Sequence, residues 1–117
     1  MDLGISGRSA ILIASSRGLG RACAESLARE GVHVVINGRT EADVLRTCDE
    51  LRDAYGITAS PVVGDATTPD VHDALLAACP QPDIVLLNGE GPPPTAFGDI
   101  DAARWADALQ RTMVSPL

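Results

Sequence analysis

The sequence predicts an α/β fold of the doubly wound type, with a partial parallel sheet in strand order 3-2-1-4 and helices on both faces. Short apolar runs alternate four times with amphipathic helical patterns. The connections between them are short, which favours parallel strands with right-handed crossovers. In this strand order the winding direction reverses between strands one and four. We therefore expect a ligand at the carboxyl ends of those two strands.

The four expected strands are short runs with β-branched residues, each followed by Ser, Gly, Asn or Asp. The first and fourth are continuous apolar runs, which is typical of strands buried on both faces. The expected strands are residues 10–14, 32–37, 58–63 and 83–87.

The four expected helices carry apolar residues at helical spacing. The first places Leu19, Ala22, Cys23, Ser26 and Leu27 on one face; the second uses Val44, Leu45, Cys48 and Leu51; the third runs from Pro69 to about Cys79; and the last starts near Asp101 and carries Ala102, Trp105, Leu109 and Met113.

Capping residues mark the helix boundaries. Gly31 ends the first helix in the left-handed conformation. Thr40 is the expected N-cap of the second helix, with Asp43 three residues later. Thr68 is the expected N-cap of the third, with Pro69 at the first helical position.

Composition excludes several classes of partner. The chain of 117 residues is 45% hydrophobic and 21% charged, which predicts one globular domain over residues 1–117. A net charge of −7 and the absence of a basic run argue against nucleic acid and anionic membrane. No apolar stretch reaches the ~18 residues of a membrane span, and no basic leader precedes an apolar run. We expect a cytoplasmic protein.

Few chemical groups in this composition suit catalysis by a side chain. All nine basic residues are arginines, so chemistry that needs a lysine amine is excluded. Tyr55 is the only tyrosine. His33, His72 and the three separated cysteines lack partners at metal-ligand spacing, so we expect no metal. The cysteines are interpreted as small buried hydrophobes in a reducing compartment.

The glycine-containing loop after the first strand is the most informative motif. Gly18 and Gly20 stand where a strand becomes a helix, so the helix amides and dipole can face a pyrophosphate. A tight turn without a ligand is the alternative. The strand before, the helix after and a second strand ending about twenty residues later favour a dinucleotide. The expected phosphate-loop residues are Ser15, Ser16, Arg17, Gly18, Leu19 and Gly20.

The end of the second strand indicates which dinucleotide binds. An Asp or Glu there would usually hold the ribose hydroxyls of NAD, but this chain has Gly38 followed by Arg39. An arginine pairs with phosphate, so the pattern favours NADP(H). Arg17 is a candidate second phosphate ligand, and Asp65 a candidate acceptor for the adenine amino group. Each of the three could instead be an ordinary loop or surface residue.

Together, four motifs resemble the amino-terminal half of the short-chain dehydrogenase/reductase family, in order and spacing: residues 13–20, Asn37-Gly38-Arg39, Gly64-Asp65-Ala66-Thr67 and Asn88-Gly89-Glu90-Gly91. The resemblance implies a Rossmann-like fold and an NADP(H)-dependent oxidoreductase acting on a small carbonyl or hydroxyl substrate. Bacterial 3-oxoacyl-carrier-protein reductases are among the similar members. It adds Ala66, Asn88 and Gly89 to the expected cofactor contacts.

Several residues depart from the family pattern. Ala14 replaces the first glycine of the loop, which is tolerable if the turn is not at positive φ. Glu90 adds a negative charge near the expected cofactor. Thr112 stands at the position of the family's active-site asparagine, so we expect no catalytic residue in this chain.

The resemblance ends before the family's catalytic Ser and Tyr-x-x-x-Lys, which predicts a truncated half-domain that is inactive alone. On this hypothesis the fourth strand becomes an uncovered apolar edge. The alternatives are a non-catalytic dinucleotide-binding or oligomerisation module, and a domain that binds nothing. In the family the last helix contributes to subunit contacts, so the resemblance also implies a homo-oligomer.

Overall fold

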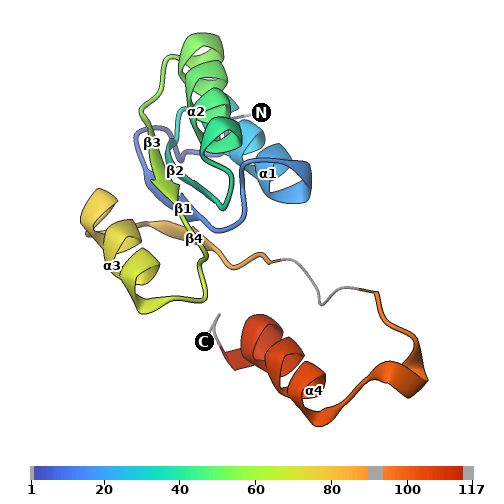
Figure 1. Cartoon of the computed structure of the whole chain (residues 1–117). Coiled ribbons are helices and arrows are strands. Elements are labelled where there is room, and N and C mark those ends of the chain that lie inside the picture. The colour runs from blue at the N-terminus through green and yellow to red at the C-terminus, as the bar shows by residue number, and fades with distance from the viewer. Residues whose placement is uncertain (1, 90–93, 115–117) are drawn as a thin grey trace.

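A computed structural model describes residues 2–89 and 94–114 of the chain. Its four strands form one parallel sheet in the order β3-β2-β1-β4, which confirms the predicted topology (Figure 1). The elements are β1 (Ser9–Leu12), α1 (Gly18–Arg29), β2 (His33–Gly38), α2 (Glu41–Tyr55), β3 (Ala59–Val63), α3 (Pro69–Ala78), β4 (Ile84–Leu86), the 3₁₀ turn η1 (Phe97–Asp99), α4 (Ala102–Leu109) and the π-helical turn η2 (Gln110–Val114).

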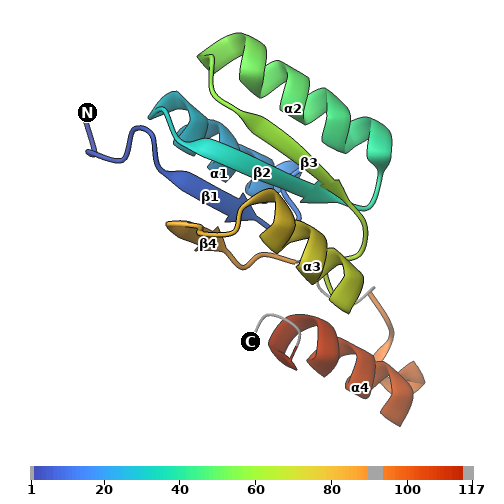
Figure 2. The same ribbon diagram turned by 90° about the vertical axis from the view of Figure 1, so that its left-hand side faces the viewer.

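Helices cover both faces of the sheet, and the alternation of strand side chains creates two apolar clusters. Leu12 and Ile36, which are register partners, face α1 and α2 in the larger cluster. Ile11 and Val35, one position earlier, join Val71 and the other buried residues of α3 in the smaller cluster. Figure 2 shows α1 and α2 on one side of the strands and α3 on the other.

The structure corrects the predicted inner face of α1. The buried residues of this helix are Gly20, Ala24 and Ala28, spaced four apart, which lets the helix approach the sheet closely. Leu19 is 73% exposed. Cys23 and Leu27 are half-buried beside the core and line an apolar groove of about 400 Å³ between α1 and β4. Cys23 and Leu27 of the predicted stripe therefore face this groove, Leu19 lies outside it, and none of the three fills the centre of the core.

The fourth strand is less buried than its apolar sequence predicts. β4 pairs only with β1 among the described strands, so it is an edge of the sheet. Val85 is 50% exposed and Leu87, just after the strand, is 54% exposed. The hypothesis that this strand forms an uncovered apolar edge is consistent with these exposures. A fully buried strand needs cover on both faces, and the described residues cover β4 incompletely.

The last helix is separate from α1 and α2 in both views (Figures 1 and 2). Asp101 caps it, because its carboxylate accepts a hydrogen bond from the backbone N–H of Arg104 at 2.8 Å. The predicted stripe on this helix is exposed, with Trp105, Leu109 and Met113 each about half accessible. Within residues 2–89 and 94–114, no helix is both long and apolar enough to cross a membrane.

Helix boundaries lie near the predicted caps, although two of the caps do not use their side chains. Thr40 and Thr68 precede α2 and α3, but neither hydroxyl bonds the helix amides. The Thr68 hydroxyl donates to the Asp65 carbonyl at 2.8 Å instead.

Cys48 and Cys79 are buried as expected, and burial raises the pKa of the Cys48 thiol.

Candidate functional site

A pocket of about 1590 Å³ lies at the carboxyl edge of the sheet. The loops after all four strands contribute to its lining, and α3 and the last helix complete it. Of the residues predicted to bind a cofactor, only Ser15 and Gly20 do not line the pocket. The predicted residues that line it are Ser16, Arg17, Gly18, Leu19, Arg39, Asp65, Ala66, Asn88 and Gly89. The topology therefore brings together residues that are far apart in the sequence.

The loop after β1 leads directly into the first turn of α1. Gly18 has φ of +62° and no atom within 4 Å of where a β-carbon would lie. A β-carbon on Gly20 would lie 2.1 Å from the carbonyl oxygen of Ala14, so only glycine allows the helix to start this close to the loop. The first turn of α1 carries no acidic residue. This helix start therefore fits an anionic group such as a pyrophosphate.

Ser15 supports the loop from inside and does not face the pocket. Its side chain is fully buried, and its hydroxyl donates to the Leu12 carbonyl at 2.8 Å. The same oxygen accepts the backbone N–H of Asn37 at 3.1 Å. The hydroxyl proton of Ser15 and one of its acceptor positions are thus used within the fold, and the role of Ser15 in the phosphate loop stays a prediction.

Asn37 connects three strand ends, a role that the sequence motifs did not assign to it. Its side-chain oxygen accepts the Ala14 N–H at 3.1 Å. Its amide donates to the carbonyls of Val62 at 3.1 Å and Gly64 at 3.2 Å. The residue is only 2% exposed. An asparagine at the end of a buried apolar strand was the sequence signal, since such a polar group needs internal partners.

Ala14 adopts the left-handed conformation, with φ of 54°, and is the only described residue other than glycine with positive φ. The condition under which alanine was judged tolerable at this position is therefore not met. The backbone is held there by hydrogen bonds on both sides: Asn37 accepts its N–H, and the Asn88 amide donates to its carbonyl at 3.1 Å. The fold maintains a conformation that disfavours the methyl group.

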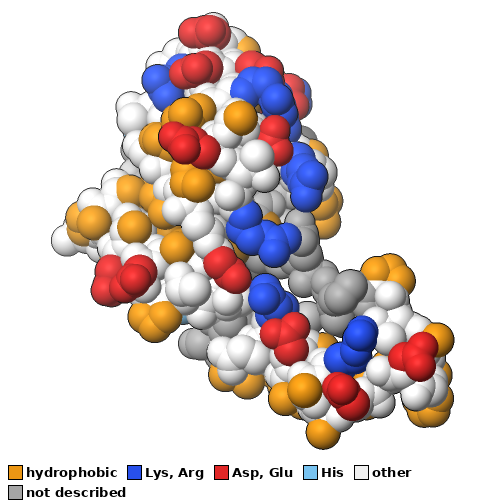
Figure 3. Space-filling model, in the orientation of Figure 1, with side chains coloured by type: hydrophobic (Ala, Val, Ile, Leu, Met, Phe, Trp, Pro, Cys, Tyr) orange, Lys and Arg blue, Asp and Glu red, His pale blue; other side chains and the backbone are white. Residues whose placement is uncertain are grey.

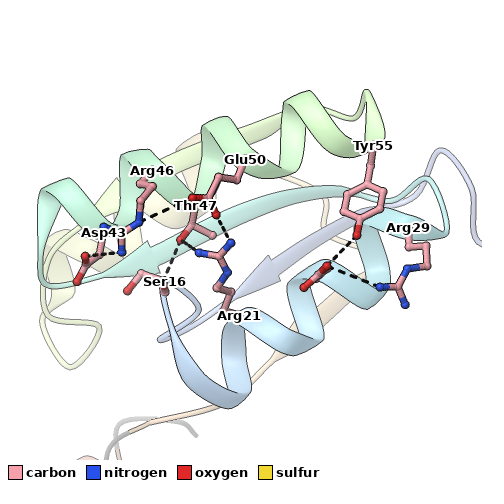
Figure 4. Close-up of polar contacts among 9 residues, drawn as sticks. Ser16, Arg21, Arg29, Asp43, Arg46, Thr47, Glu50 and Tyr55 are labelled. Atoms are coloured by element: carbon pink, nitrogen blue, oxygen red, sulfur yellow. Dashed lines mark hydrogen bonds and ion pairs between the residues drawn. The ribbon is translucent and has the colours of Figure 1, made fainter.

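Helix α2 holds the next residue of the loop in place (Figure 4). The hydroxyl of Thr47, which is fully buried, donates to the Ser16 carbonyl at 2.9 Å. Arg21 donates to the same hydroxyl at 3.3 Å and forms an ion pair with Glu50. The Arg21 guanidinium lowers the pKa of the Glu50 carboxyl. The loop, α1 and α2 are thus joined by one polar network.

Two arginines lie at the pocket. Arg17 lines it from the loop after β1, and Arg39 from the end of β2. Figure 3 shows basic side chains on the face of the molecule where the sheet and its helices adjoin the last helix. Gly38, immediately before Arg39, contributes no carboxylate at this edge.

Asp65 is used by its own loop. One carboxylate oxygen accepts the N–H of Thr67 at 2.9 Å and its hydroxyl at 2.7 Å, and these bonds lower the pKa of Asp65. The other oxygen lies 3.6 Å from Arg111, whose charge lowers that pKa further. The proposed contact with an adenine amino group would have to share a carboxylate that already has these partners.

Arg111 and His72 are among the pocket-lining residues that were not predicted as part of a site. Arg111 reaches the pocket from η2, directly after α4, and His72 reaches it from the first turns of α3. The ring Nε2 of His72 contacts the carbonyl oxygen of Ala66. Neither had a sequence signal beyond its residue type, because tertiary packing alone brings both helices to this edge.

The end of β4 meets the first loop at Asn88, through its bond to the Ala14 carbonyl. Gly89 also lines the pocket, with open space at its β-carbon position. Glu90, which was interpreted as a charge near the cofactor, lies outside the described residues.

Thr112 is exposed, and its hydroxyl donates to the Ala108 carbonyl at 2.6 Å within the helix.

Tyr55 lies between α1 and the far end of α2 and is not part of the pocket lining (Figure 4). Its hydroxyl donates to Glu25 at 2.8 Å, and the Arg29 guanidinium lies 6.0 Å from its ring centroid. Within the described part of the chain, His, Cys, Asp and Glu side chains form no group of three that could hold a metal ion.

Comparison with known proteins gives a consistent result. The family model "short chain dehydrogenase" matches residues 8–117. The uncharacterized oxidoreductase YvaG of Bacillus subtilis (strain 168) is 36% identical over 106 residues, which cover 90% of this chain and 40% of the relative. Gluconate 5-dehydrogenase of Gluconobacter oxydans (strain 621H) is 37% identical over 90 residues, covering 74% and 35%.

Solved structures show the same fold as this chain. L-Sorbose reductase from Gluconobacter frateurii, complexed with NADPH and L-sorbose, superposes with a TM-score of 0.90 at 27% identity. The match covers 98% of this chain and 45% of the reductase. The chain thus spans less than half the length of the relatives named here.

Proposed function

The chain belongs to the short-chain dehydrogenase family, and on this premise we propose that its pocket binds NADP(H). The observation that carries the proposal is the end of β2, where Gly38 offers no carboxylate and Arg39 lines the pocket. A carboxylate at this place would accept the ribose hydroxyls of NAD and repel a 2′-phosphate. An arginine is a phosphate partner with several donors.

The proposed contacts divide between backbone and side chains. The backbone amides of Ser16, in the loop, and of Gly18 and Leu19, at the start of α1, would donate hydrogen bonds to the pyrophosphate. Arg17 and Arg39 would pair with the 2′-phosphate. Ala66, Asn88 and Gly89 would lie along the rest of the dinucleotide. The solved complex of a similar reductase with NADPH supports the choice of cofactor.

For the whole protein we propose an oxidoreductase that transfers hydride between the nicotinamide and a small carbonyl or hydroxyl compound, as 3-oxoacyl-carrier-protein reductases do. The nicotinamide supplies the hydride chemistry. These 117 residues include no lysine, and Tyr55 is engaged with Glu25 outside the pocket. We therefore propose that they form a cofactor-binding half-domain without turnover of its own. A non-catalytic dinucleotide-binding module is the alternative.

We further propose that the protein self-associates. The last helix exposes Trp105, Leu109 and Met113, and hydrophobic side chains gather along its lower side in Figure 3. An exposed apolar stripe of this kind is typical of an interface. We also propose a cytoplasmic location for the protein, in which Cys23, Cys48 and Cys79 are free thiols.

Substitution of one arginine tests the choice of cofactor. Arg39→Ala should weaken NADPH binding by about tenfold to a hundredfold, the usual effect of losing a hydrogen bond to a charged group. NADH, which lacks the 2′-phosphate, should be affected less than about threefold. Isothermal titration of the 117-residue chain with each dinucleotide measures both affinities.

Arg46→Ala is the matched control. Arg46 lies on the outer side of α2, pairs with Asp43 at 2.8 Å and does not line the pocket. Both affinities should be unchanged in this variant. Equal affinity of the unsubstituted chain for NADPH and NADH would contradict the proposed role of Gly38 and Arg39. Binding of neither dinucleotide would contradict the proposed function itself.

A further inference from the structure

The end of β2 has no room for a side chain at residue 38. Gly38 is buried and does not have positive φ, so its backbone conformation alone would accept other residues. A β-carbon there would nevertheless lie 2.4 Å from Oγ and 2.9 Å from Cβ of Ser16. It would also lie 3.0 Å from a methyl group of Val44 on α2. The space is closed from the loop side and from the helix side.

Ser16 cannot easily move away from this position. It is 7% exposed, and Thr47 holds its carbonyl by a 2.9 Å hydrogen bond (Figure 4). Its neighbour Ser15 is tied to β2 by its N–H, which donates to the Asn37 carbonyl at 2.8 Å. Rotation about the Ser16 side-chain bond moves Oγ but leaves Cβ in place. Relief of the 2.9 Å contact would require movement of the loop backbone.

We propose that Ser16 is a specificity-determining residue, because its side chain excludes any side chain at residue 38 and so keeps the end of β2 free of a carboxylate. This inference rests on the proposed function, since it concerns the choice between NADP(H) and NAD(H) in the same pocket. Cofactor preference is then a property of the pair Ser16 and Gly38. Introduction of an acid at residue 38 changes the preference only when residue 16 loses its side chain.

A stability cycle tests the steric part without any cofactor. Gly38→Ala adds only the β-carbon and should lower the ratio of folded to unfolded protein about tenfold or more, as overpacking of buried sites does. In Ser16→Gly/Gly38→Ala, at least half of that loss should return. Urea unfolding of the two single variants, the double variant and the unsubstituted chain measures the coupling.

Gly98→Ala is the matched control for the added methyl group. Gly98 is exposed, has no positive φ and has no atom within 4 Å of its β-carbon position. The substitution should leave the unfolding midpoint unchanged, and Ser16→Gly/Gly98→Ala should show simple additivity. Additivity in the Ser16/Gly38 cycle as well would overturn the proposal.

A binding cycle tests the consequence for specificity. Gly38→Asp alone should be destabilised and bind neither dinucleotide well. Ser16→Gly/Gly38→Asp should fold and show a ratio of NADH to NADPH affinity at least tenfold higher than that of the unsubstituted chain, by isothermal titration. If Gly38→Asp alone is as stable as the unsubstituted chain and already prefers NADH, the proposal is wrong.

The two cycles separate the two proposals. If the unsubstituted chain binds neither dinucleotide, the proposed function fails and the role of Ser16 in specificity fails with it. If the chain prefers NADPH but the cycles are additive, the proposed function stands and only the coupling of Ser16 to residue 38 is wrong.

Discussion

Two regions of this molecule differ in how completely their side chains are partnered. At the loop between β1 and α1, buried polar groups are closely bonded: Ser15, Asn37 and Thr47 all have partners within the fold. At the β4 edge and the last helix, apolar side chains such as Val85 and Trp105 are half exposed. The first region is complete within these residues, and the second presents surface that other proteins of this size usually cover.

The loop between β1 and α1 is therefore the part of the molecule that is preorganised for a ligand. A phosphate loop must keep its backbone amides directed at one point, which requires a rigid, satisfied support. The described residues supply that support through β2 and α2. The edge at β4 instead presents apolar side chains and the unpaired backbone groups of an edge strand, which a further strand or a second copy of the chain would cover.

The largest expected effect separates the two regions with the same substitution. Leu12→Ala removes a fully buried side chain and should cost about 3 kcal/mol of unfolding free energy. Leu87→Ala, at a side chain that is 54% exposed, should cost less than about 0.5 kcal/mol. Urea unfolding of both variants measures the contrast. Equal costs would show that the β4 edge is covered in solution.

A smaller effect concerns the strained residue of the loop. Ala14→Gly should stabilise the chain by about 0.5 kcal/mol, because relief of the left-handed strain exceeds the added entropy of the unfolded state. The hydrogen bonds of Ala14 use its backbone and are retained. Ala42→Gly, at an exposed position in the first turn of α2, should instead destabilise by about 0.5 kcal/mol. Thermal unfolding that shows the same sign for both variants would contradict the strain at Ala14.

The smallest effect is a pH dependence from Asp65. The folded-state pKa of Asp65 is lowered, so its stabilising contribution is present above the unfolded pKa of about 4 and is lost as the pH falls through the folded value. Solvent screens this carboxylate, whose side chain is 34% exposed, so the contribution is well under about 1 kcal/mol.

Urea unfolding from pH 7 to pH 3 should therefore show Asp65→Asn less stable than the unsubstituted chain at pH 7, with the difference shrinking as the pH falls below about 4. Asp73→Asn, at an exposed position on α3, is the control and should show a constant difference. A difference between the chain and Asp65→Asn that stays constant across this range would contradict the role of the Thr67 bonds.

Much of the fold and of the site location was predictable, because strand order follows from chain alternation and crossover handedness. Nine of the predicted cofactor residues, Arg39 and Asn88 among them, line one pocket. The failures have local causes. Leu19 was assigned inward by its hydrophobicity, but α1 needs small residues against the sheet. Ser15 belongs to the predicted phosphate loop, but the sequence does not show that Leu12 and Asn37 bind its hydroxyl.

The sequence by itself determined the topology, the position of the pocket and the types of residue at its rim, since these depend on periodicity and on short turn motifs. Only the tertiary structure decided which side chains are available. It turned Ser15 inward, placed Ala14 at positive φ and brought Arg111 beside Asp65. It also set Ser16 against Gly38. These outcomes depend on distances between segments more than twenty residues apart, which no local pattern encodes.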